Sequence, residues 1–396
     1  MQKNYDFLII GAGIIGISIA LELKKRNQKF KICVLEKEDV IAYHSSGRNS
    51  GVLHAGFYYT ADTLKAKFTK AGNNYLKEYC QKKSLRINHC GKLVVTKNEE
   101  DLISLDELFK RAKINQVELH ELTTDEAKKI EPRVKTFKRA AWSPQTSTID
   151  PTEVMNSLLS DCVAAGIDLH FKTHYLNHIK NTVHTDNGSF QAGFIINAAG
   201  LYADKIAKDF GFSQNFRILP FKGLYLYCSE SENKFRTHIY PVPNLKNPFL
   251  GVHHTLTVDG RSKIGPTAIP AFWREQYDGF SRFNLSETIR ILADETYLFF
   301  SGGFDFRSLA IEELKKYNKE YLVNESSALA EAVHLKNYTQ WGKPGIRAQL
   351  FNVNTNKLEM DFKFEGDKNS LHILNAISPA FTCSQPFAEF IATQIL

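Results

Sequence analysis

The sequence predicts an α/β protein, and three apolar runs carry this prediction. The first, Phe7–Ile10, ends at a glycine-rich turn that is followed by a helical pattern, and the second covers residues 31–37. The third, Phe194–Asn197, comes much later and also ends in small residues. Runs that are apolar without alternation are typical of strands buried on both faces of a parallel sheet. We therefore expect parallel strands with helices packed on both faces.

The turn after the first strand has the spacing G-x-G-x-x-G, formed by Gly11, Gly13 and Gly16. In a strand–helix–strand unit the first glycine permits a tight turn, and the second lets the backbone approach a pyrophosphate. The third lets helix and strand pack closely. The N–H groups at the start of the helix, at Ile14 and Ile15, would then attract the phosphate charge.

An acidic residue closes the second strand. Glu36 follows the last glycine of the turn by 20 residues, and a carboxylate at this place can accept hydrogen bonds from the ribose hydroxyls of an adenosine. Its neighbour Lys37 belongs to the same expected site. Because strand, helix, second strand and acid fall in register, the segment predicts a dinucleotide-binding site.

Two further segments indicate which dinucleotide. Residues 44–56 read "HSSGRNSGVLHAG", a small, polar, glycine-rich loop that can lie flat against a bulky ring system and donate N–H groups to it. Nicotinamide dehydrogenases have no common use for such a loop here. After the third run, Ala199 and Gly200 would let the strand end approach the pyrophosphate. We therefore predict FAD, with these loop residues at the cofactor: His44, Ser45, Ser46, Arg48, Asn49, Ser50 and Gly51.

Between the second and third runs the pattern predicts a helix, a strand and a hairpin. A helix is expected from Asp150, as its N-cap, to Gly166, with Pro151 in its first turn. The strand "IDLHFKT" follows, and a hairpin turns at Asp186–Gly188 to return into the central sheet.

Composition excludes several classes of protein. The 396 residues carry a formal net charge of +7 without a basic block, so no nucleic acid is expected as a partner. The six cysteines form no C-x-x-C pair, so no metal site is predicted and free thiols in a reducing cytoplasm are expected. No signal peptide and no spanning segment is apparent. Peripheral contact with the inner face of a membrane stays open.

Several stretches, spread almost from end to end, belong to one family pattern. They include "HSSGRNSGVLHAGFYYT", "CGKLVVTK", "TIDPTEV", "INAAG", "YPVPNLKNPFLGVHHT", "GPTAIPAF", "KPGIRAQL" and "LHILNAISPAFTCS". On these stretches the chain resembles the FAD-dependent oxidoreductases of the D-amino-acid oxidase superfamily. Within it, the chain is most similar to the L-2-hydroxyglutarate oxidase/dehydrogenase family.

The resemblance implies a Rossmann-like FAD-binding domain interleaved with a mixed-sheet α+β substrate domain. We expect the FAD-binding domain in residues 1–80, 145–210 and 335–396. The substrate domain would then take residues 81–144 and 211–334.

The resemblance also implies oxidation of a 2-hydroxy acid, with L-2-hydroxyglutarate as the leading substrate and hydride transfer to the flavin N5 atom. A histidine suits the role of base, and His54 and His372 are the candidates. The expected substrate-binding residues are cationic, phenolic or imidazole groups: Tyr59, Lys222, His254 and Arg347. Arg347 is also assigned to the cofactor, as are Ser378 and Thr382 near the start of the last helix.

Two alternatives stay open. The chain could be a glycerol-3-phosphate oxidase or amino-acid oxidase of the same superfamily, or a redox-inactive flavin-binding subunit. The electron acceptor would be oxygen or a quinone, and the sequence does not distinguish them.

Overall fold

The computed structural model of the protein describes residues 4–229, 235–243, 249–301 and 306–396. Residues 244–248, inside the family stretch "YPVPNLKNPFLGVHHT", lie outside the described residues. The chain forms two compact, interleaved units. The first unit comprises Met1–Asn49, Pro151–Pro220 and Arg347–Leu396, and the second comprises Ser50–Asp150 and Phe221–Ile346.

The first unit is built on a sheet with the strand order β10-β11-β12-β1-β2-β9, and β23 continues the sheet beside β12. The neighbours β9, β2, β1, β12 and β23 run parallel, as the apolar runs predict. The strands are β1 (Asn4–Ile10), β2 (Ile32–Leu35), β9 (Asp168–His170), β10 (Tyr175–Ile179), β11 (Thr182–Thr185), β12 (Gly188–Asn197), β22 (Lys363–Gly366) and β23 (Ser370–Asn375).

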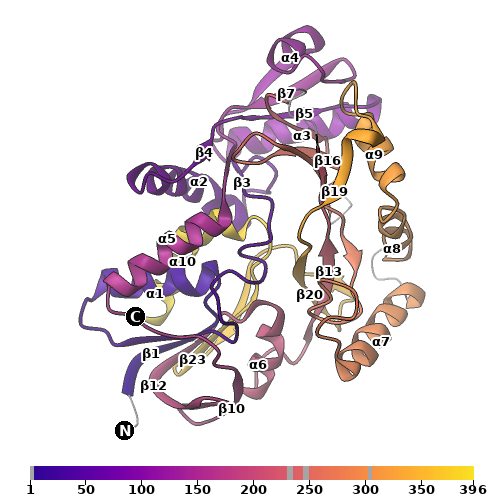
Figure 1. Ribbon diagram of the computed structural model, residues 1–396. Coiled ribbons are helices and arrows are strands. Elements are labelled where there is room, and N and C mark those ends of the chain that lie inside the picture. The colour runs from indigo at the N-terminus through magenta and orange to yellow at the C-terminus, as the bar shows by residue number, and fades with distance from the viewer. Residues whose placement is uncertain (1–3, 230–234, 244–248, 302–305) are drawn as a thin grey trace. The chain divides into compact units, whose positions relative to one another are not determined.

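Helices cover both faces of this sheet. On one side α1 packs against α5 and α10 (Figure 1). On the other side Ile206 of α6 joins Leu8 and Ile10 of β1 in a buried cluster. Their bounds are α1 (Ile14–Arg26), α5 (Pro151–Ala164), η1 (Gly200–Tyr202), α6 (Ala203–Asp209) and α10 (Ala380–Ile395). The expected α/β class, with a Rossmann-like unit, is confirmed.

The helix and the hairpin expected between the second and third runs are both present. α5 begins at Pro151, and β9 follows it as a strand parallel to β2. β11 and β12 pair antiparallel, with Thr185 opposite Gly188 at the turn.

The second unit is built on a mixed sheet with the order β19-β14-β17-β16-β15-β5-β7-β6, in which β15 and β5 run parallel. Its strands are β5 (Lys92–Val95), β6 (His120–Thr123), β7 (Arg139–Ser143), β14 (Leu226–Cys228), β15 (His238–Pro241), β16 (His253–Leu256), β17 (Ser262–Gly265) and β19 (Tyr338–Trp341). Its helices are α2 (Leu64–Lys82), α3 (Glu99–Ile114), α4 (Thr124–Ile130), α7 (Leu285–Ser301), α8 (Phe306–Lys315), α9 (Lys319–Ser327) and η2 (Leu335–Asn337).

Residues 50–80 belong to the second unit, whereas we expected them in the FAD-binding domain. The cause is a small sheet of β3 (Val52–Leu53), β8 (Ser147–Ile149) and β4 (Ile87–Asn88), in which Val52 pairs with Thr148. The side-chain amide of Asn73, on α2, reinforces this pairing by donating to the carbonyls of Leu53, His54 and Gln145 at 3.1 Å each.

Another sheet has the order β18-β13-β20-β21, with bounds β13 (Phe216–Gly223), β18 (Ile269–Pro270), β20 (Gly345–Asn352) and β21 (Lys357–Leu358). Two of the four places at which the chain passes from one unit to the other fall within β13 and β20.

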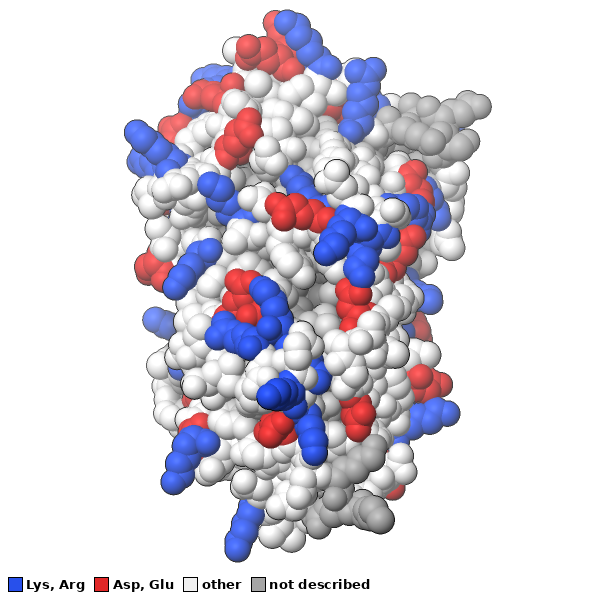
Figure 2. All heavy atoms as spheres, turned by 90° about the vertical axis from the view of Figure 1, so that its left-hand side faces the viewer, with Lys and Arg blue, Asp and Glu red and all other residues white. Residues whose placement is uncertain are grey.

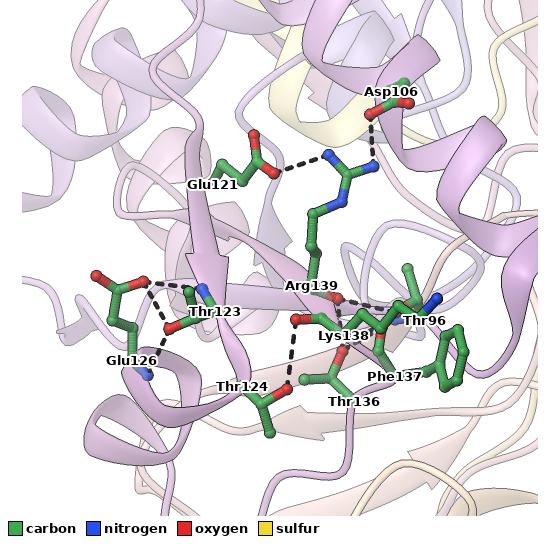
Figure 3. A network of polar contacts seen from close by, with 10 residues as sticks. All are labelled: Thr96, Asp106, Glu121, Thr123, Thr124, Glu126, Thr136, Phe137, Lys138 and Arg139. Atoms are coloured by element: carbon green, nitrogen blue, oxygen red, sulfur yellow. Dashed lines mark hydrogen bonds and ion pairs between the residues drawn. The ribbon is translucent and has the colours of Figure 1, made fainter.

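At one end of the mixed sheet a polar network fixes α3, β6 and β7 together (Figure 3). Arg139 of β7 binds Glu121 of β6 at 2.7 Å and Asp106 of α3 at 2.8 Å. The Thr123 hydroxyl and the Glu126 carboxylate close the first turn of α4 as a capping box. Since the ion pairs are partly exposed, we assign this network a structural role.

Candidate active site

The glycine turn of the first unit leaves no room for side chains. Gly11 has φ +108°, and a Cβ atom there would lie 2.6 Å from the carbonyl oxygen of Ala198. A Cβ atom on Gly16 would lie 2.0 Å from the carbonyl oxygen of Gly11. The first and third glycines are therefore required by close backbone packing of β1, α1 and the end of β12.

The N-terminus of α1 opens directly onto this turn. Gly13 is its N-cap residue and has no side chain with which to cap the helix. The Ser46 hydroxyl instead accepts the N–H of Ile14 at 2.9 Å. Ile15 is the next residue of the first helical turn, which contains no acidic side chain to oppose a phosphate.

Glu36 lies beside the turn, as expected of the ribose-binding acid. Its carboxylate accepts the backbone N–H groups of Ala12 and Glu38, each at 3.0 Å. The first contact ties the acid at the end of β2 to the glycine turn at the end of β1. This places one negative group next to the N-terminus of α1.

The loop after β2 is folded on itself. The Asn49 amide donates to the carbonyls of Ser45 and Ser46, at 3.2 and 2.9 Å, and the Arg48 guanidinium donates to the carbonyl of Tyr43 at 2.6 Å. The Nε2 atom of His44 lies 2.9 Å from a carboxylate oxygen of Glu38.

The Glu38 carboxylate also binds Lys37, at 3.0 Å, and the Lys37 ammonium lies 4.9 Å from the centre of the Tyr202 ring. These two contacts involve the charged end of the Lys37 side chain. Ser50 and Gly51, expected at the cofactor, belong to the second unit, where Gly51 accepts the N–H of Ile149.

The end of β12 also meets the turn. Ala198 donates its N–H to the carbonyl of Ile10 at 2.9 Å, and Ala199 donates to the Asn197 side chain at 3.1 Å. Gly200 has φ +54°, and no atom lies within 4 Å of the Cβ position there. The Ala198 hydrogen bond keeps the end of β12 close to β1.

Three further expected residues lie near the C-terminus in the first unit. Ser378 is exposed in the loop before α10, and Thr382 is buried in the first turn of that helix. The N-cap of α10 makes no side-chain hydrogen bond. Arg347 is half-buried on β20.

His372 lies inside the first unit, on β23. Its ring nitrogens contact the Asn197 amide at 3.2 Å and the Ser370 hydroxyl at 3.1 Å, and its ring packs on Phe210 and Phe212. Burial lowers the pKa of His372 to about 4. Because both nitrogens are engaged in a packed core, this geometry favours a structural role over the expected role of base.

His54 lies in the second unit, on the segment after β3, and is 9% exposed. Its backbone carbonyl accepts the Asn73 amide, which holds the segment against α2. The pKa of His54 is well below its ordinary value. Burial is the largest cause, followed by the charges of Lys92, His253 and Lys65. The imidazole is therefore neutral at neutral pH, which is the form that a general base requires.

Two of the expected substrate-binding residues are also in the second unit. Tyr59 follows the His54 segment, and its carbonyl accepts the Asn115 amide at 2.8 Å. Lys222 is buried on β13, and burial lowers its pKa while the charge of Asp278 opposes this change.

The two adjacent histidines of β16 point to opposite faces of the sheet, as alternate residues of a strand must. His254 donates its Nε2–H to the carbonyl oxygen of Ser326, on α9, at 3.0 Å and packs on Phe235. His253 instead stacks on Tyr240, with ring centres 3.7 Å apart, and lies near enough to His54 to lower its pKa. His253 therefore lies near His54, whereas the expected His254 lies on the opposite face of the sheet.

Sequence reasoning missed the other groups on this face of the mixed sheet, although two of them lie in the family stretches "CGKLVVTK" and "YPVPNLKNPFLGVHHT", because a stretch alone does not show which of its side chains share one face of a sheet. They are Lys92, His238 and Tyr240. The one available signal was a lysine at the start of the apolar strand "KLVV".

One face of the molecule is drawn with its charged side chains in Figure 2. On the face shown in Figure 2, Lys and Arg side chains are interspersed with Asp and Glu side chains. In the described part of the chain, no helix combines the length and apolar character needed to cross a membrane.

Comparison with known proteins defines the class. Residues 6–312 match the family described as "FAD dependent oxidoreductase" (DAO), and the chain belongs to this family. The glycine turn, the start of α1 without an acidic side chain in its first turn, and the acid at the end of β2 fit an FAD molecule, which is the cofactor of the family.

More specific similarity runs along the whole chain. The chain is 33% identical over 403 residues to an L-2-hydroxyglutarate dehydrogenase of Escherichia coli (strain K12), covering 99% of this chain and 93% of that protein. It is 32% identical over 427 residues to the mitochondrial L-2-hydroxyglutarate dehydrogenase of Bos taurus, covering 99% and 89%. Among solved structures, the FAD-bound L-alpha-glycerophosphate oxidase of Mycoplasma pneumoniae has the same fold, with a TM-score of 0.77, 23% identity and coverage of 98% and 93%.

Proposed function

We propose that the protein oxidises L-2-hydroxyglutarate to 2-oxoglutarate. The observation that carries this proposal is the similarity to L-2-hydroxyglutarate dehydrogenases over 99% of the chain. FAD, when bound, supplies a two-electron acceptor for the hydrogen that leaves the substrate carbon as hydride. The residues of the chain must then bind the substrate anion and take the proton of its hydroxyl group.

We assign the hydroxyl proton to His54. Its low pKa keeps the ring neutral at neutral pH, so it can accept a proton without first losing one. Its buried position excludes water that would compete for the proton. His372 is the weaker candidate because neighbouring side chains engage both of its nitrogens.

The substrate is a dianion, and the chain offers cationic and phenolic groups to bind it. Arg347 can bind a carboxylate through two parallel N–H groups. We propose that Arg347, Lys222 and Tyr59 contribute to this binding, as the family resemblance implies.

Anaerobic reduction of the purified holoenzyme tests the substrate assignment. L-2-hydroxyglutarate should bleach the flavin absorbance, and the D enantiomer, glycerol 3-phosphate and glycine should not. Bleaching by glycerol 3-phosphate or by an amino acid, without bleaching by L-2-hydroxyglutarate, would assign the chain to another reaction of the superfamily. No bleaching by any of these compounds would favour a redox-inactive flavin-binding subunit.

We further propose that the protein contacts a membrane surface through α7 and passes its electrons to a quinone. The support is the unusual orientation of this helix, which exposes Leu285, Ile289 and Phe300. Its acidic side chains are turned inward and buried: Glu287, Asp294 and Glu295. A helix with an apolar outer face and without acidic groups on that face suits an anionic lipid surface.

Sedimentation with phosphatidylglycerol vesicles tests this contact. The protein should sediment with the vesicles, and Ile289→Glu together with Phe300→Glu should abolish sedimentation. A change from dimer to monomer in the double variant, without vesicle binding by the unaltered protein, would assign the face to a second copy of the chain. Faster reoxidation of the reduced enzyme by oxygen than by a soluble quinone would contradict the proposed acceptor.

A further inference from the structure

Lys92, the first residue of β5, is a fully buried lysine without a hydrogen-bond acceptor. Its side chain is 0% exposed, and in the part of the chain that the structure describes no acceptor contacts its Nζ atom. Three aromatic rings surround this atom instead. The ring centres of Tyr240, Tyr58 and Phe57 lie at 4.2, 5.1 and 5.7 Å.

One of these rings carries a second buried donor. The hydroxyl oxygen of Tyr58 is also buried and has no hydrogen-bond partner among the described residues. A buried donor that lacks an acceptor is costly, and a buried ammonium is more costly still. Cation–π contacts with the rings offset part of this cost. Two neighbouring donors without an acceptor indicate a site whose acceptor is a ligand.

The groups around Lys92 supply no counter-charge. The titratable residues on the elements packed against it are Cys90, His54, His238, His253, Tyr58 and Tyr240. Burial lowers the pKa of the histidines and raises that of the thiol and the phenols, so all are neutral at neutral pH. Within the described residues Lys92 forms no ion pair with a carboxylate.

Two of the neighbouring histidines, His238 and His253, already form other hydrogen bonds. His238 accepts the N–H of Leu256 at Nδ1, at 3.0 Å, so Nε2 carries the proton and donates to the Thr148 hydroxyl at 2.9 Å. His253 lies 2.8 Å, through Nδ1, from the carbonyl oxygen of Gly251. Lys92 and Tyr58 thus remain, among the described residues of this face, as donors that a ligand could engage.

We propose that the Lys92 ammonium and the Tyr58 hydroxyl bind one carboxylate of the 2-hydroxy acid substrate. This inference rests on the proposed function and adds to it a carboxylate-binding role for Lys92 and Tyr58. A carboxylate only accepts hydrogen bonds, so one such group satisfies both donors. The surrounding rings exclude water, which strengthens the attraction between the two charges. The Lys92 charge also lowers the pKa of His54, so the proposed anion site lies near the proposed base.

Proton uptake gives this site a distinctive signature. Burial lowers the pKa of Lys92 to about 7, so at pH 8 the free amine is mostly neutral. A bound carboxylate favours the charged form and raises this pKa again. Binding of the product 2-oxoglutarate at pH 8 should therefore take up close to one proton, and binding at pH 6 should take up almost none.

Isothermal titration of the FAD-loaded enzyme with 2-oxoglutarate, in buffers of different ionisation enthalpy, measures affinity and proton uptake together. We expect Lys92→Met to weaken binding by roughly 100-fold, as for the loss of a buried charged hydrogen bond, and to abolish proton uptake. Tyr58→Phe should weaken binding by about 10-fold and keep the uptake. The matched control is Lys316→Met, which removes a lysine that is equally buried but paired with Glu313. It should leave affinity and uptake unchanged.

The outcomes separate this inference from the proposed function. If the unaltered enzyme neither binds 2-oxoglutarate nor is reduced by L-2-hydroxyglutarate, the proposed function is wrong. If it does both but takes up no proton at pH 8, or if Lys92→Met binds as tightly as the unaltered enzyme, the Lys92 site is wrong. The measurement on the unaltered enzyme decides this even if Lys92→Met does not fold.

Discussion

Replacing Gly16 by alanine should cost the protein its cofactor. The added Cβ atom would lie 2.0 Å from the carbonyl oxygen of Gly11, whereas such atoms normally keep about 3.5 Å apart. The start of α1 must therefore move away from the end of β1 by more than about 1 Å. Overpacking of this kind costs about 1–3 kcal/mol or more.

The displacement affects cofactor binding directly, because the same turn holds the Ala12 N–H against the Glu36 carboxylate at 3.0 Å. A loss of about 1.4 kcal/mol in binding weakens affinity tenfold, so we expect the dissociation constant for FAD to rise at least tenfold. The assay is titration of the apoprotein with FAD, followed by quenching of flavin fluorescence, with the thermal midpoint measured in parallel.

Gly166→Ala is the matched control. Gly166 has φ +68° after α5, but no atom lies within 4 Å of its Cβ position. Its replacement costs only the left-handed conformation, about 1–2 kcal/mol, and should lower the thermal midpoint without changing affinity for FAD. Wild-type affinity in Gly16→Ala, or an equal loss in Gly166→Ala, would refute the assignment of the turn to the cofactor.

Three further predictions concern charged and titratable groups. His54→Ala should lower kcat by about 100-fold with FAD still bound. In the unaltered enzyme the pKa of His54 lies well below 6.5. The rate of flavin reduction at saturating substrate should therefore be constant from pH 6.5 upward and fall only at lower pH. A threefold loss or less would exclude His54 as the base. Burial lowers the pKa of His254 to about 4, so the unfolded chain binds a proton below pH 6.5 that the folded chain does not. The free energy of unfolding therefore falls by about 1.4 kcal/mol per pH unit from pH 6.5 toward 4 on account of this group. Urea unfolding of His254→Gln should show a smaller fall of this free energy with decreasing pH. The same fall in the variant as in the unaltered protein would contradict the assignment. Glu36→Gln should weaken FAD binding about tenfold, as for loss of a charged hydrogen-bond acceptor, while Glu126→Gln, in the capping box of α4, should leave it unchanged.

The first strand, helix and second strand could be predicted from the sequence because their signals are local. The apolar run of β1, the glycines and Glu36 lie within a short segment, and each is dictated by its immediate neighbours. The assignment of residues 50–80 to a unit could not be predicted in the same way. It depends on the pairing of Val52 with Thr148, which are far apart in the sequence.

The histidines show the same limit at the level of single side chains. A motif can draw attention to the pair on β16, but only the register of that strand decides that His253 faces Tyr240 while His254 faces α9. His372 lies in a family stretch, yet its contacts with Asn197 and Ser370 explain its place without catalysis.

Lys92 is the clearest case. In the sequence Lys92 lies in the family stretch "CGKLVVTK", but nothing there distinguishes it from other lysines, and its strand otherwise reads as core. The environment of its ammonium group is formed by the rings of Phe57, Tyr58 and Tyr240, which come from two other segments of the chain. A buried charge that no neighbouring residue neutralises can persist only because the packing of the whole unit holds it in place. Such a group indicates the position of a ligand-binding site more directly than a sequence motif does. The chemistry of the site is therefore divided: local sequence determines the cofactor cradle, and long-range sheet register determines which groups can meet the substrate.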